Sequence, residues 1–219
     1  GQREEMRQSM NDLLAIQMLP NVNLDYLPWT TAALRPAAVA ALLNEIVIHK
    51  RSSVLEFGAG ISTLYVANLF QKKGDGHITT VEHDEEWAKT VKSYLRQMGV
   101  EKRKYSIIKS SICKYKKGKK NWYNKKELKK RLKKEYDMIV VDGPPAQGEK
   151  NKEIRYQALP FASNFAREEL VIFLDDIGRE GEKRISRKWK REYELNMRKV
   201  AGMGVFRPKK NSEKFAIRV

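Results

Sequence analysis

The sequence predicts an α/β fold, in which a mostly parallel sheet carries helices on both of its faces. Short apolar runs such as MIVV and LVIFL alternate with longer amphipathic stretches, a pattern typical of buried parallel strands joined by helices. The chain has 219 residues, enough for one such domain with a sizeable core. A tight turn containing Gly58 and Gly60 follows the first of these strands, so we look for one site beside it.

The first part of the chain precedes this alternation. Four apolar residues recur at helical spacing before Pro20, which predicts a helix packed on the domain: Met6, Met10, Leu13 and Leu14. A turn-rich connector follows, and Pro36 then takes the first position of a second helix. The apolar side of that helix should hold Leu42, Leu43, Ile46 and Val47. We therefore divide the chain into an N-terminal helix with its connector, residues 1–36, and a main domain, residues 37–219.

The alternating pattern begins at Val54. Strands are predicted over residues 54–56, 77–84, 104–112, 136–143 and 169–176, and helices over residues 61–69, 85–99, 155–168 and 180–193. The tail departs from the alternation, because residues 200–208 and 213–219 read as two strands joined through PKKNS. The simplest arrangement of these two strands is an antiparallel pair.

Most of the net charge of +17 lies in one segment, residues 114–135, which we call the basic segment. It has twelve Lys and Arg against two Glu, whereas the rest of the chain has 32 basic and 25 acidic residues. Its aromatic residues could stack on nucleic-acid bases while its cations attract phosphates: Tyr115, Trp122 and Tyr123. Leu128 and Leu132 give it a thin apolar stripe that could instead lie on an anionic membrane surface. A solvated insertion that raises solubility is the third interpretation.

The compartment is predicted from cysteine usage and hydropathy. Cys113 is the only cysteine, so it cannot form an internal disulfide, and it has no partner at metal-ligand spacing. Apolar runs such as AAVAALL are far shorter than a bilayer span, and GQREEMRQSM lacks a signal-peptide apolar region. We expect a soluble cytoplasmic protein. The chain begins with glycine rather than methionine, which leaves a removed leader open.

The glycine turn indicates which ligand the site holds. A dinucleotide fingerprint would need a third glycine where Thr63 stands, and the G-K-[ST] of a phosphate-binding loop is absent. The pattern that fits is E-x-G-x-G, in which Glu56 can accept from a ligand ammonium while Gly58 and Gly60 let a ligand approach the backbone. One strand later, Glu82 is placed to accept hydrogens from two ribose hydroxyls. The implied ligand has a ribose and a positively charged amino-acid end.

These segments resemble motifs I and II of the class I S-adenosylmethionine-dependent methyltransferases. That family has a Rossmann-like, seven-stranded, mostly parallel sheet with an antiparallel C-terminal strand, which matches the tail predicted above. VLEFGAGIST, TTVEHDEEW, MIVVDGPP, RYQALP and FLDDIGREGEKR together resemble a poorly characterised bacterial subgroup. The similarity runs from about Tyr26 to Val219, except for the basic segment.

The resemblance implies a set of cofactor contacts. Around the methionine part of the cofactor it places Glu56, Phe57, Gly58, Ala59, Gly60, Ser62 and Thr63. It places Glu82 on the ribose hydroxyls, with His83 and Trp87 lining the adenine, although Trp87 could be a core residue and His83 a solvated strand end. Ser110 and Ser111 end the third strand, where the family often contacts the adenine amino group.

The acceptor side is predicted at the ends of two later strands. Asp142 should emerge close to the reactive methyl group, beside the cofactor, unless it only caps the turn that the prolines make. Asp175 and Asp176 should lie next to it, and three converging carboxylates can bind Mg²⁺. Catechol-type O-methyltransferases use a similar arrangement, commonly with Asp-Asn where this chain has Asp-Asp. Without a metal, one of the three could act as general base.

The function predicted is methyl transfer from S-adenosylmethionine to oxygen or nitrogen of an acceptor, with a saccharide or another small molecule favoured. Residues proposed to contact the acceptor are Tyr26, Trp29, Thr30, Arg155, Tyr156 and Arg179. Three alternatives stay open: a nucleic-acid methyltransferase, a non-catalytic module that binds nucleic acid or another polyanion through the basic segment, and an NAD-dependent oxidoreductase. The sequence does not indicate the oligomeric state.

Overall fold

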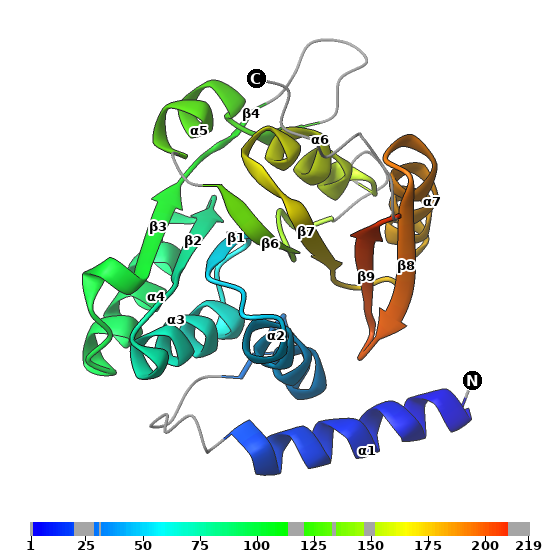
Figure 1. Ribbon diagram of the computed structural model, residues 1–219, viewed down its shortest axis with the longest axis horizontal. Helices are drawn as coiled ribbons and strands as arrows, with labels where there is room; N and C mark the ends of the chain where they lie inside the picture. Colours follow the sequence, from blue (N-terminus) through cyan, green and yellow to red (C-terminus); the bar gives the residue numbers. More distant parts are fainter. Residues whose placement is uncertain are drawn as a thin grey trace.

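The computed structural model describes residues 2–19, 29–30, 32–113, 121–132, 135–146 and 152–209. Its centre is a seven-stranded sheet with helices on both faces (Figure 1). The strands, in spatial order, are β3 (Tyr105–Lys109), β2 (His77–Glu82), β1 (Ser53–Phe57), β6 (Tyr136–Val141), β7 (Ala166–Leu174), β9 (Met203–Pro208) and β8 (Leu195–Val200). A small antiparallel pair, β4 (Ile112–Cys113) and β5 (Trp122–Tyr123), lies outside this sheet.

The helices fall into two layers. Those on one face are α2 (Pro36–Ile48), α3 (Ile61–Lys73) and α4 (Glu85–Gln97), with α1 (Gln2–Met18) outside them (Figure 1). Those on the other face are α5 (Lys125–Arg131), α6 (Ala158–Ala162) and α7 (Glu180–Glu192). Short 3₁₀ turns complete the chain: η2 (Lys102–Lys104), η4 (Ile154–Gln157) and η5 (Ser163–Phe165). Within the described ranges, no helix combines the length and apolarity that a bilayer crossing requires.

The strand pairing confirms the predicted sheet. Strands β3, β2, β1, β6 and β7 run parallel, and β9 runs antiparallel to both of its neighbours. The strand order reverses direction between β1 and β6, which is where ligands bind in open α/β sheets. The C-terminal ends of β1, β2, β6 and β7 therefore meet along one edge of the sheet.

The final hairpin is formed by other strands than those predicted. The hairpin consists of β8 and β9, whereas we predicted strands over residues 200–208 and 213–219; the second of these lies outside the described residues. The turn is formed by Ala201 and Gly202, both with positive φ, which is the backbone that a two-residue hairpin turn requires. The Ala-Gly pair was the signal for this turn, and we had placed it inside a strand.

The basic segment also differs from the prediction, because its apolar residues are part of the core. The side chains of Trp122, Tyr123 and Leu128 are fully buried and that of Leu132 is 3 % exposed. The two aromatic rings pack against Phe57, with centroids 5.2 and 5.9 Å away. Neither ring is therefore available to stack on a base, and the leucine stripe faces the sheet instead of a membrane. Tyr115 lies outside the described residues.

The helix predicted near the N-terminus forms, but its apolar residues are not packed. Met6, Met10, Leu13 and Leu14 are each 58 % or more exposed. The helix is held instead by Ala15, which is buried, and by Asp12, whose carboxylate accepts from the Ala37 N–H at the start of α2 and pairs with Arg35. Of the four apolar residues predicted to be buried in α2, Val47 is 54 % exposed and the other three are buried: Leu42, Leu43 and Ile46.

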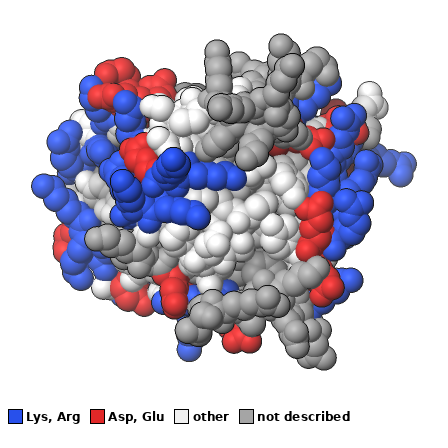
Figure 2. Space-filling view, turned by 90° about the horizontal axis from the view of Figure 1, so that it is seen from above, with Lys and Arg blue, Asp and Glu red and all other residues white. Residues whose placement is uncertain are grey.

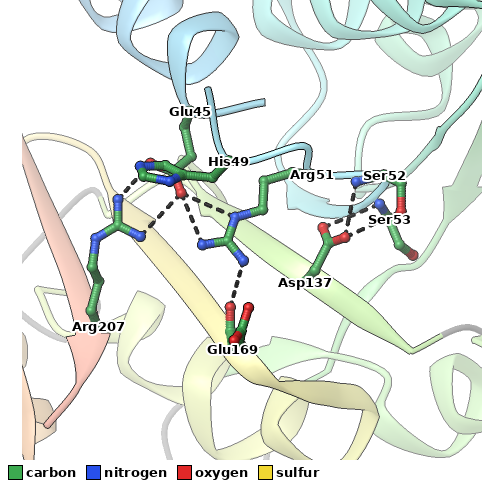
Figure 3. Close-up of polar contacts among 8 residues, drawn as sticks. All are labelled: Glu45, His49, Arg51, Ser52, Ser53, Asp137, Glu169 and Arg207. Atoms are coloured by element: carbon green, nitrogen blue, oxygen red, sulfur yellow. Dashed lines mark hydrogen bonds and ion pairs between the residues drawn. The ribbon is translucent and has the colours of Figure 1, made fainter. Parts of the chain in front are cut away.

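A polar network lies at the opposite end of the sheet, where the parallel strands begin (Figure 3). Buried Glu45 of α2 accepts from Arg51 at 3.0 Å and from Arg207 of β9 at 2.5 Å. Burial raises the pKa of Glu45, but Arg207 and Arg51 outweigh this and hold the pKa below its ordinary value. Asp137 of β6 accepts the N–H groups of Ser52 and Ser53 at 2.9 and 3.1 Å. These contacts join the N-terminal ends of the strands to α2. The site lies at the opposite, C-terminal ends.

Candidate active site

A pocket of about 560 Å³ lies at the C-terminal ends of β1, β2 and β6. Its volume is within the usual range for small-molecule sites. Residues that line it and that the sequence predicted are Gly58, Ala59, Glu82, His83, Trp87, Asp142, Arg155, Asp176 and Arg179. Residues that line it and that were not predicted are Ala32, Asp84, Tyr123, Gly143, Pro145 and Ala146.

The floor of the pocket is made by two glycine turns in close contact. Gly58 has φ +96°, and a Cβ there would lie 2.9 Å from the backbone nitrogen of Gly143. Both turns are tied to Phe57, whose carbonyl oxygen accepts the N–H groups of Asp142 and Gly143 at 3.0 and 2.6 Å. The glycine in DGPP is therefore required by the approach of the two chains. Gly60 differs, because a Cβ there would meet nothing within 4 Å.

Glu82 presents a charged carboxylate to the pocket. Its Oε1 accepts the N–H groups of His83 and Asp84 at 2.6 and 2.8 Å, and its Oε2 accepts that of Ala59 at 2.8 Å. The imidazole Nδ1 of His83 is 2.7 Å from Oε1. Burial raises the pKa of Glu82, but the His83 side chain and the backbone N–H groups outweigh this, and the pKa is lowered. The same contact with Glu82 raises the pKa of His83.

Trp87 is fixed beside this carboxylate by its helix. Asp84 caps α4, since its Oδ1 accepts the Trp87 N–H at 2.9 Å. The indole N–H of Trp87 donates to the carbonyl oxygen of Ala59 at 2.7 Å, which ties the helix to the glycine turn. Trp87 is half-buried and lines the pocket as well as packing on the core. Asp84 was the missed signal here, since an aspartate before EEW is a helix cap.

Glu56 lies behind the pocket and is fully buried. Its carboxyl oxygens accept from the hydroxyls of Ser62, Thr63 and Thr80 at 2.5, 2.5 and 2.8 Å. Burial raises the pKa of Glu56 to about 7, although the three hydroxyls oppose the shift. In this arrangement Glu56 joins β1 to the start of α3 and to β2.

The three aspartates predicted at the acceptor side come together. Asp142 follows β6, Asp175 and Asp176 follow β7, and their carboxyl oxygens lie within 4.8 Å of one another. We call these three residues the carboxylate cluster. Burial raises the pKa of Asp142, against the opposing effect of Arg155. Burial and then the charge of Asp142 raise the pKa of Asp175.

A buried arginine balances this negative charge. Arg155 of η4 is 4 % exposed, and its guanidinium lies 3.3 Å from Asp142 and 3.2 Å from Asp176. It is also 3.7 Å from the buried carboxylate of Glu182. Arg179, which is mostly exposed, pairs with the same Asp176 oxygen, Oδ2, at 2.7 Å. The site therefore supplies its own cations to the carboxylates.

Several predicted site residues do not line the pocket. The Phe57 ring packs in the core, and Ser62 and Thr63 are buried beside Glu56. Asp175 belongs to the carboxylate cluster but, unlike Asp142 and Asp176, does not line the pocket. Ser110 is buried and accepts the Asn124 N–H, while Ser111 is exposed. The Tyr156 hydroxyl donates to Glu192, away from the pocket. Trp29 and Thr30 are exposed in the connector, whose neighbour Ala32 does line the pocket, and Tyr26 lies outside the described residues.

Comparison of the sequence with known protein families identifies the family of this chain. A family model described as a methyltransferase domain matches residues 55–177, more than half of the chain. No curated protein matches the sequence.

Solved structures show the same fold at low sequence identity. An O-methyltransferase from Bacillus cereus, in complex with S-adenosylhomocysteine, has 15 % identity and a TM-score of 0.57, with 91 % of each chain covered. The methyltransferase PaMTH1 from Podospora anserina, also bound to S-adenosylhomocysteine, has 14 % identity and a TM-score of 0.61, with 92 % of this chain and 87 % of that chain covered. The O-methyltransferase TomG from Streptomyces achromogenes has 16 % identity and a TM-score of 0.56, with 90 % and 87 % covered.

Proposed function

The chain belongs to the methyltransferase domain family, and from this premise we propose that it transfers a methyl group from S-adenosylmethionine to oxygen or nitrogen of a small, hydroxyl-rich acceptor. A saccharide is the favoured class of acceptor. The observation that carries the proposal is a single pocket with Glu82 at one end and the carboxylate cluster at the other. The solved structures compared above include methyltransferases in complex with S-adenosylmethionine or its product.

The residues at the Glu82 end fit this cofactor. The Oε2 atom of Glu82 accepts the Ala59 N–H, and a carboxylate oxygen has a further acceptor site for a ribose hydroxyl. Trp87 and His83 offer ring surfaces next to it for an adenine. The absence of atoms near a Cβ at Gly60 supports a close approach of the methionine end to this turn. When bound, S-adenosylmethionine supplies an electrophilic methyl group on a sulfonium centre.

The residues at the other end fit an acceptor that carries hydroxyl groups. Asp142 and Asp176 offer acceptors, and Arg155 and Arg179 offer donors, all within the lining of one pocket. The raised pKa of Asp142 makes it a base that can take a proton from the acceptor near neutral pH. Arg155 holds Asp142 in place through a charge-assisted contact and limits the cost of its charge. Alignment of the acceptor with the methyl group of the cofactor supplies much of the remaining rate acceleration.

A magnesium ion on the carboxylate cluster is the alternative source of positive charge. The spacing of the three aspartates suits a hard cation with oxygen ligands. The guanidinium of Arg155, however, already contacts two of them from a buried position, so an ion would have to displace it. The residues present therefore fit an arginine-balanced cluster better than a metal centre. We propose a metal-independent reaction.

The experiment is a methyl-transfer screen with S-adenosylmethionine that carries a labelled methyl group, using saccharides and other hydroxylated small molecules as acceptors. With the best acceptor, Asp142→Asn should lower the rate at least about 100-fold, because the base is lost. The Kd for S-adenosylhomocysteine should change by less than about threefold, since Asp142 serves the acceptor. A fully active Asp142→Asn enzyme would leave that residue with a structural role only.

A further inference from the structure

A second hollow, which shares no lining residue with the pocket, lies along the edge strand β3 of the sheet. It has a volume of about 480 Å³ and is floored by Tyr105, Ser106, Ile107 and Ile108 of β3. Its walls carry Lys92 and Arg96 of α4, Lys102 of η2 and Arg131 of α5. We call it the edge groove. We propose that the edge groove binds an extended acidic segment of a partner protein, which adds to β3 as a further strand.

The charge of the edge groove is unbalanced. All four of its charged lining residues are cations. In the described part of the chain, Lys92, Arg96 and Lys102 form no ion pair, whereas the nearby Glu101 is engaged by Arg103 and Gln71. Only Arg131 has an acidic partner, Glu127 at 3.4 Å. Figure 2 shows Lys and Arg side chains on both the left and the right of this face, and the left is the side on which Figure 1 shows β3 and α4. An occupant of opposite charge is therefore favoured.

The floor of the edge groove is the main chain of an edge strand. Strand β3 pairs with β2 on one side, and no strand among the described residues pairs with its other side. Such an edge presents unpaired N–H and C=O groups that can accept an added strand. At its C-terminal end the Arg131 guanidinium already donates to the Lys109 carbonyl oxygen at 3.1 Å. A peptide backbone is the partner that uses these groups.

The cations on α4 match the side-chain repeat of an added strand. Lys92 and Arg96 are four residues apart on one helix, so their Cβ atoms are about 6 Å apart. Alternate residues of a strand, which point to the same face, are about 7 Å apart. Acidic residues at every second position of the added strand would therefore meet Lys92 and Arg96 in turn. Its other residues would face the α5 side.

A nucleic acid is the less favoured occupant. Its recognition would draw on aromatic rings for stacking. Trp122 and Tyr123 are fully buried, and among the lining residues of the edge groove only Tyr105, which is half-buried, is aromatic. A phosphate backbone can accept from the N–H groups of an edge strand but has no donor for its C=O groups, whereas a peptide backbone pairs with both. The two observations favour a peptide over an oligonucleotide of the same charge.

The test is the binding of a capped ten-residue peptide of alternating Glu and Thr to the full chain, followed by fluorescence anisotropy at low salt. We expect saturable binding that weakens as salt is added. Lys92→Glu/Arg96→Glu should weaken it at least about tenfold, because two attractive contacts become repulsive. The matched control is Lys183→Glu/Arg187→Glu, which reverses two exposed cations at the same spacing on α7 and should change the affinity less than about twofold. Circular dichroism checks that both variants fold.

Two further probes of equal charge decide the mode of binding. A peptide of alternating Glu and Pro lacks half of the main-chain N–H groups and should bind at least about tenfold more weakly. Hexathymidylate, with five phosphates, should also bind more weakly than the Glu-Thr peptide. Equal affinity for the proline peptide would overturn strand addition, and tighter binding of the oligonucleotide would assign the edge groove to nucleic acid. Absence of peptide binding would mean that the cations only protect the strand edge.

Discussion

Gly58 and Gly60 belong to one motif, but the two glycines are required for different reasons. Gly58 has a left-handed backbone and approaches Gly143, so its requirement comes from the folded chain itself. Gly60 has φ −177°, which any residue can adopt, and has open space where a side chain would be. The motif alone suggested a single purpose for both, namely room for a ligand. The contact between the glycines of two separate turns could not be predicted from either turn.

A matched pair of substitutions separates these roles. Gly58→Ala should lower the Tm by roughly 3 to 10 °C, because it adds backbone strain and a collision with Gly143. Gly60→Ala should leave the Tm within about 2 °C of the wild type, since its Cβ meets no protein atom. Thermal unfolding without ligand measures both. Equal Tm values for the two variants would refute the contact between the glycine turns.

Arg155 shows where prediction of single residues succeeded and where it did not. The positions of Asp142, Asp175 and Asp176 at strand ends predicted that they would meet, because the ends of neighbouring parallel strands share one edge. Arg155 was predicted to contact an acceptor, and it does line the pocket. Its pairing with the aspartates depends on where η4 lies relative to the ends of β6 and β7, which no local pattern indicates. Asp176, at φ +57°, also adopts a backbone that the sequence alone does not reveal.

Removal of metal ions tests the role of Arg155. Because its guanidinium neutralises the carboxylate cluster, dialysis against EDTA should change the methyl-transfer rate by less than about twofold. The rate is measured with the acceptor found in the screen, before and after addition of Mg²⁺. A loss of about tenfold or more that Mg²⁺ restores would show that an ion displaces Arg155 in the active enzyme.

Among the elements of the fold, the basic segment combines a run of cations with a few buried apolar residues, and its amino-acid composition reveals only the cations. Its cations dominate the sequence, so the segment was expected to be solvated or to bind a polyanion. Its few apolar residues decide its position instead, because burying Trp122, Tyr123 and Leu128 against the sheet removes a large apolar area from water. Asn124 caps the short helix α5 that follows, accepting the Glu127 N–H at 3.3 Å. The pattern W-Y-N before a helix was the available signal.

Substitution within the basic segment checks this account. Trp122→Ala should reduce the free energy of unfolding by about 3–5 kcal/mol, because it removes a fully buried aromatic side chain from contact with Phe57 and Phe161. Lys126→Ala, which alters an exposed residue four positions later, should change it by less than about 0.5 kcal/mol. Urea unfolding gives both values. If Trp122→Ala were as stable as Lys126→Ala, the basic segment would be an appendage to the domain.

In the molecule as a whole, the two ends of the parallel strands have separate roles. The network of Glu45, Arg51 and Arg207 lies where these strands begin (Figure 3), and the pocket lies where they end. The mostly parallel sheet was predictable from the short buried runs that alternate with helices, and the family resemblance implied its antiparallel final strand. The exposed apolar side of α1 was not, since periodicity reports which residues share a face and not whether that face is covered.

We propose that the pocket holds S-adenosylmethionine, and thermal unfolding with S-adenosylhomocysteine tests this, with NAD as control. A ligand at about 100 times its Kd adds about 2.7 kcal/mol to the stability of the folded state. For a domain of this size we predict a rise in Tm of roughly 5 to 10 °C with S-adenosylhomocysteine and none with NAD. The Asp142→Asn protein should show the same rise. No rise with S-adenosylhomocysteine, or an equal one with NAD, would contradict the assignment of the pocket.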